Sequence, residues 1–122
     1  MQFNGKQLTA MTKFGIAMIQ ADGKVDDNEL KFLAHEIASF GLDENEFRTL
    51  IDLAEQMSFE EALSVVKDFD DEQKTEASAF LGTMIAVDGD ADETELKLWS
   101  LVSHLCGFPT MTIGEAIKIM QG

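Results

Sequence analysis

The chain has 122 residues and a formal net charge of −14, from 23 acidic side chains and only nine basic ones. The basic residues are scattered and include a single arginine, so no patch forms that could hold a phosphate backbone or an anionic membrane surface. The balance argues against a nucleic-acid-binding protein and favours a cation or a basic protein as the partner.

Length and composition predict one domain over residues 1–122, since 45% of the residues are apolar and can fill a core. The only cysteine, Cys106, excludes an internal disulfide and fits a reducing compartment. No secretion signal is evident, and no apolar run reaches the roughly 18 residues of a membrane span. We expect a cytoplasmic protein without membrane insertion.

Apolar residues recur every three or four positions, which predicts an all-α fold, a compact bundle of about seven helices. In chain order the helices are expected near 6–21, 27–40, 44–56, 59–68, 71–87, 93–105 and 113–121. Most starts carry a capping box, in which Ser, Thr, Asp or Asn precedes Glu or Gln by three residues. The pairs are Asn4/Gln7, Asp26/Glu29, Asp43/Glu46, Ser58/Glu61, Asp70/Gln73, Asp92/Glu95 and Thr112/Glu115.

The same periodicity predicts which residues of each helix face the core. The expected inward residues are Leu8, Met11, Gly15, Met18 and Ile19 on the first helix, Leu30, Leu33, Ile37 and Phe40 on the second, Phe80, Met84 and Ile85 on the fifth, and Leu96, Trp99 and Leu105 on the sixth. Methionine and phenylalanine at these positions are typical of core filling rather than of a ligand site.

An internal repeat is the most informative feature of the sequence. Residues 14–41 and 80–107 are identical at ten of 28 positions, at an offset of 66 residues. The matches centre on an acidic Asp-Gly turn, which follows one helix and precedes the next in each copy. The chain therefore predicts two pseudo-symmetric helix–acidic turn–helix units, over about 8–42 and 74–108.

The six acidic residues of the two turns have a structural and a functional interpretation. Capping accounts for the four acids that begin the helix after each turn, namely Asp26, Glu29, Asp92 and Glu95. Asp22 and Asp88 instead stand at the C-terminal end of a helix, where a carboxylate opposes the macrodipole at a cost of about 0.3–1 kcal/mol. Because this cost occurs in both copies of the repeat, we infer that the carboxylates of each turn serve together as ligands. The candidate metal ligands are Asp22, Asp26, Glu29, Asp88, Asp92 and Glu95.

Oxygen ligands favour Ca²⁺ or Mg²⁺ over Zn²⁺ as the cofactor. A self-sufficient EF-hand is excluded, because aligning Asp22 and Gly23 with loop positions five and six puts Met18 and Gln20 at ligand positions one and three. A divalent-metal site here needs the other repeat, water or a partner to complete it. Lys24 in the first turn replaces Asp90 of the second, so the second turn is expected to bind a cation more tightly.

Paired turns of this pattern, in an all-helical domain of this length, resemble the TerB (tellurite-resistance) family over about residues 8–121. The resemblance implies a compact fold with pseudo-symmetric helix pairs and a divalent-metal site at the six acids. It further implies a cytosolic stress-response or interaction module, because TerB proteins are linked to tellurite and other stress responses.

Two other functions stay open at this point. An acidic face could dock a basic protein partner without any metal, or a carboxylate cluster could hold Mg²⁺ over a phosphate-bearing substrate. An enzyme is not expected, since the sequence has no phosphate-binding glycine loop and no Glu-x-x-His motif. His35 and His104 are expected to be ordinary helix residues, and Cys106 to be buried and inert.

Overall fold

The structure, a computed structural model, describes residues 3–21, 23, 27–86 and 93–122. Within these residues the chain forms seven helices and no strand, which confirms the predicted all-α class. Predicted and observed helix ends differ by at most two residues. The helices are α1 (Gly5–Gln20), α2 (Asp27–Ala38), α3 (Glu44–Gln56), α4 (Phe59–Lys67), α5 (Asp71–Ile85), α6 (Glu93–Cys106) and α7 (Ile113–Gln121).

The predicted capping boxes set the start of four helices. In each, the N-cap side chain accepts a hydrogen bond from the backbone N–H three residues later, and that residue's side chain accepts one from the N-cap backbone. The four boxes are Asn4/Gln7, Asp43/Glu46, Asp70/Gln73 and Thr112/Glu115. Ser58 accepts from the Glu61 N–H at α4. The boxes that begin with Asp26 and Asp92 lie outside the described residues.

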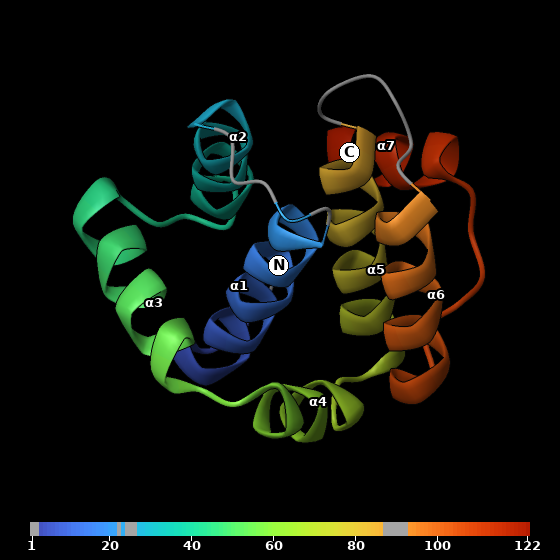
Figure 1. Cartoon of the computed structure of the whole chain (residues 1–122), viewed down its shortest axis with the longest axis horizontal. Coiled ribbons are helices and arrows are strands. Elements are labelled where there is room, and N and C mark those ends of the chain that lie inside the picture. Colours follow the sequence, from blue (N-terminus) through green and yellow to red (C-terminus); the bar gives the residue numbers. More distant parts are fainter. Residues whose placement is uncertain (1–2, 22, 24–26, 87–92) are drawn as a thin grey trace.

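Helix α1 is the centre of the arrangement. In Figure 1, α2 and α3 lie on one side of it and α5, α6 and α7 on the other, while α4 crosses one end. α1 packs against all of these except α7, which covers α5 instead. The predicted division into repeat units is not decided by this packing and stays a prediction.

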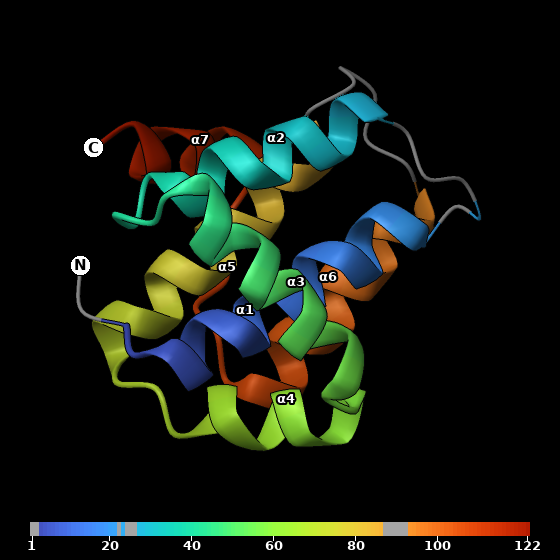
Figure 2. The same ribbon diagram turned by 90° about the vertical axis from the view of Figure 1, so that its left-hand side faces the viewer.

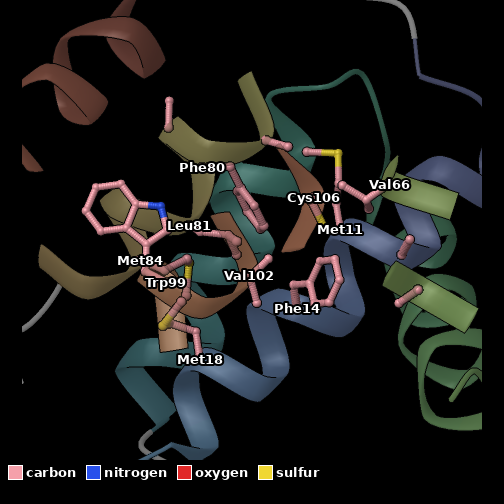
Figure 3. Packing of buried hydrophobic residues seen from close by; sticks show 14 of the residues in the cluster. Met11, Phe14, Met18, Val66, Phe80, Leu81, Met84, Trp99, Val102 and Cys106 are labelled. Atoms are coloured by element: carbon pink, nitrogen blue, oxygen red, sulfur yellow. The ribbon is translucent and has the colours of Figure 1, made fainter. Parts of the chain in front are cut away.

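The core lies where α1 and α5 meet, with α4, α6 and α7 closing it. Figure 3 shows Met11, Phe14 and Met18 of α1 against Phe80 and Met84 of α5, all at most 2% exposed. The predicted inward faces of α1 and α5 are confirmed. Those of α2 and α6 are partly wrong, because three predicted core residues are between a third and two fifths exposed: Leu30, Leu96 and Leu105.

Gly82 marks the closest approach of α5 to its neighbours. A Cβ atom at this position would lie 2.7 Å from the Ala116 Cβ and 2.7 Å from the Trp99 ring. Neither atom can move without shifting a helix, since Trp99 is buried and its indole N–H donates to the Ser78 hydroxyl at 3.2 Å. The absence of a side chain at position 82 therefore lets α5, α6 and α7 pack together.

We predict that Gly82→Ala destabilises the protein by about 1–3 kcal/mol, since overpacking outweighs the gain in helix propensity. Gly114→Ala is the matched control. Its Cβ would meet only the Thr112 hydroxyl, at 3.8 Å, so the substitution is expected to stabilise by about 0.4–1 kcal/mol. Urea unfolding measures both changes, and a Gly82→Ala variant as stable as the control would refute the close packing.

Candidate functional site

The structure places two of the six predicted metal ligands, Glu29 on α2 and Glu95 on α6. The other four, Asp22, Asp26, Asp88 and Asp92, lie outside the described residues. The site is therefore built from these two glutamates and from the helix ends that precede and follow each turn.

These helix ends lie on one side of the molecule. Figure 2 shows the C-terminal end of α1 and the N-terminal ends of α2 and α6 together at the right. α1 packs against both α2 and α6, which keeps this side of the fold together. The arrangement is compatible with two turns that share a site, while their contact stays a prediction.

Glu29 and Glu95 both point into the protein. Glu29 is 8% exposed and Glu95 is 3% exposed, whereas the leucine that follows each of them is more than a third exposed. The first inward-facing residue of α2 and of α6 is thus the glutamate. Hydrophobicity alone predicts that the leucine after it faces inward instead. The two copies of the repeat agree in this orientation.

Capping does not account for this burial. Glu46 and Glu115 occupy the same third position in the capping boxes of α3 and α7, and both are exposed. A glutamate can therefore satisfy a capping box at the surface of this protein. Burial of Glu29 and Glu95 is a separate property of the helices that follow the acidic turns.

A buried carboxylate needs compensation, because removal of a charge from water costs several kcal/mol unless it is paired, hydrogen-bonded or bound to a metal. The positive end of the helix macrodipole contributes, since both glutamates are in the first turn of their helices, and both residues also have interaction partners within the protein. Two inward carboxylates beside further acids in the sequence provide the hard oxygen donors that Ca²⁺ and Mg²⁺ prefer.

The part of the chain that the structure describes holds no cluster of metal-ligating side chains. Among the described residues, no group of three or more His, Cys, Asp and Glu side chains is placed to hold a metal ion. His35 and His104 are exposed in the last turns of α2 and α6, where a histidine is an ordinary helix residue. No helix in the described ranges is long and apolar enough to cross a membrane.

Cys106 is buried at the end of α6, as the sequence predicts, with 2% of its surface exposed. Burial raises the pKa of the thiol above its ordinary value, and the nearby Lys67 and Lys74 only partly oppose this rise. A protonated, enclosed thiol is a poor nucleophile, so redox sensing is not favoured at this residue.

We predict that native Cys106 reacts with a disulfide reagent on the order of a hundredfold more slowly than in urea, because reaction requires local opening. The reagent releases a coloured thiolate when it reacts with the cysteine, so absorbance measures the rate of this reaction. Ser100→Cys in a Cys106→Ser background is the control: Ser100 is exposed on the same helix and its replacement should react rapidly. Equal rates for the two thiols would contradict the burial.

A family model of the tellurite resistance protein TerB matches residues 5–117. The chain belongs to the TerB family. A crystal structure of a protein of unknown function from Porphyromonas gingivalis W83 is similar, with 37% sequence identity and a TM-score of 0.90. The similarity covers 99% of this chain and 98% of the other. No match was found among curated proteins.

Membership of the TerB family confirms the resemblance drawn from the acidic turns. It does not by itself assign a ligand, and the similar structure carries no assigned function. The orientation of Glu29 and Glu95 is the property of this TerB-family chain that sequence reasoning missed. Its only signal is the repetition of the Glu-Leu pair in both copies.

Proposed function

We propose that this TerB-family protein is a cytosolic module that binds a divalent cation through its two acidic turns. The proposed ligands are Asp22, Asp26 and Glu29 of the first turn and Asp88, Asp92 and Glu95 of the second. Ca²⁺ or Mg²⁺ is the expected ion, given a donor set made of carboxylates. The family description suggests that this binding serves a response to tellurite or a related stress.

One observation carries the proposal: Glu29 and Glu95 are buried at equivalent positions, whereas the capping glutamates of other helices are exposed. A bound cation adds a favourable interaction to those that the two glutamates already make within the protein, and it neutralises part of the net charge of −14. The residues of this chain then act by presenting oxygen atoms on one side of the bundle, at the ends of helices that pack together.

Thermal unfolding tests the proposal, since a ligand that binds the native state must raise its stability. At a concentration 100 times its dissociation constant, a cation contributes about 2.7 kcal/mol, which corresponds to roughly 10 °C for a domain of this size. NaCl at the same ionic strength is the control for screening of the acidic surface. No shift with Ca²⁺, Mg²⁺ or Mn²⁺ beyond the NaCl control would refute cation binding.

A further inference from the structure

A groove lies at the opposite end of α1 from the acidic turn. Its volume is about 610 Å³, and its walls come from the first turns of α1, from α3 with the loop before it, and from the start of α4. This size is within the usual range for a ligand site. Because the groove contacts α1 at Gly5–Thr9, it is separate from the proposed cation site beyond Gln20.

The floor of the groove is apolar. Leu50, Leu53 and Met57 line it at helical spacing along α3 and its C-cap, and Leu42 of the preceding loop and Leu8 of α1 also line it. Leu50 and Met57 are buried, but Leu53 is 46% exposed in the middle of this row. Leu53 therefore leaves apolar surface in the groove that an apolar side chain of a partner can cover.

The rim of the groove is acidic. Residues 43–61 contain seven acidic side chains and one basic one, Arg48, which pairs with Glu44 at 3.2 Å on the exposed side of α3. Glu46 and Glu61 line the groove itself, and Lys6 is the one cation among its lining residues. An occupant therefore meets an apolar floor with two acids and one lysine at its edges, beside a strongly acidic segment of the chain.

We infer that this groove binds a short amphipathic helix of a partner protein, with leucine-like side chains on one face and Lys or Arg beside them. α3 has 13 residues and is about 20 Å long, which matches three to four turns of a partner helix. Apolar anchors spaced three and four residues apart fill the groove, and the basic side chains pair with Glu46 and Glu61.

The charges of the rim argue against other occupants. A second copy of this chain would bring a further net charge of −14 and another acidic rim to the same place, which repels. A fatty acid could pair its carboxylate only with Lys6 among the lining residues and would meet two opposing acids, Glu46 and Glu61. A basic helix is the occupant whose charge complements the groove, and complementary charge also speeds encounter and fixes orientation.

The test uses a fluorescein-labelled synthetic helix of about 14 residues, with Leu at i, i+3, i+4 and i+7 and Lys at the flanking positions. Fluorescence anisotropy against the full chain should show saturable binding that weakens with added NaCl. The same peptide with Glu in place of Lys should bind at least tenfold more weakly. A Leu/Lys peptide of the same composition without the helical spacing should also bind at least tenfold more weakly.

Matched variants locate the binding. Leu53→Asn should weaken the peptide complex at least tenfold, while Leu101→Asn, which removes a leucine that is 50% exposed on α6, should change it less than twofold. Glu61→Gln should weaken binding more than Glu72→Gln. Both are exposed acids in the first turn of a helix, but only Glu61 lines the groove.

Equal effects of Leu53→Asn and Leu101→Asn would overturn the inference, since peptide binding would then not be located in the groove. A dimer in sedimentation equilibrium that Leu53→Asn dissociates would also overturn it, by assigning the groove to a second copy. So would decanoate, if it bound the groove and displaced the peptide at equal or lower concentration. The cation-binding proposal is unaffected by each outcome, because the groove is at the other end of α1.

Discussion

Phe80→Ala should lower the free energy of unfolding by about 3–5 kcal/mol, the largest effect expected from one side chain in this protein. Phe80 has no exposed surface, and its ring lies 6.3 Å from the ring of Phe40. It also fills the space above Gly15, where α1 and α5 meet. Alanine leaves a cavity that two packed helices cannot close.

Urea unfolding followed by circular dichroism measures this loss. Phe47→Ala is the control, because Phe47 of α3 is only partly buried at the edge of the core and should lose about 1 kcal/mol. Comparable losses in the two variants would show that the contact between α1 and α5 does not dominate the core.

The second large effect concerns the acidic turns. The double substitution Asp22→Asn, Asp88→Asn should abolish the stabilisation by Ca²⁺ or Mg²⁺, a loss of about 2.7 kcal/mol at 100 times the dissociation constant of the wild-type protein. An amide carries no charge to attract the ion, so the affinity falls. Without a divalent ion the variant should be as stable as the wild type or more so, because two negative charges are removed from a protein whose net charge is −14.

Asp43→Asn, Asp70→Asn is the control for this experiment. It also removes two negative charges, but these come from the N-caps of α3 and α5, where asparagine caps almost as well as aspartate. Its response to the cation should equal that of the wild type. If both double variants lose the response, general charge explains the cation effect and the acidic turns do not form a specific site.

The helices could be predicted from the sequence because short local motifs indicate where each helix begins and ends. Asp43/Glu46 and Thr112/Glu115 form the hydrogen bonds that their spacing predicts, and Gly41 and Gly107 adopt the positive φ angles expected after a helix. The close approach of α6 and α7 to α5 at Gly82 could not be predicted, since it depends on how three helices pack together rather than on a local sequence pattern.

The candidate site was readable only in part. The repeat drew attention to six candidate acids, whose role as ligands stays a prediction, while hydrophobic periodicity predicted Leu30 and Leu96 as core residues and did not predict burial of Glu29 and Glu95. The structure reverses this orientation in both helices. A pattern based on hydrophobicity cannot anticipate such a reversal, because it assigns every carboxylate to solvent whether or not a counter-charge lies inside.

Amide chemical shifts recorded during a Ca²⁺ titration, with Mg²⁺ in parallel, test the central claim most directly. We predict saturable shifts in residues 18–30 and 84–96, larger in the second segment, where Asp90 replaces Lys24. Amides of the groove at Thr49, Leu53 and Glu61 should stay unchanged. No saturable shift at millimolar concentrations, or shifts spread evenly over the acidic surface, would contradict a cation site built from the two turns.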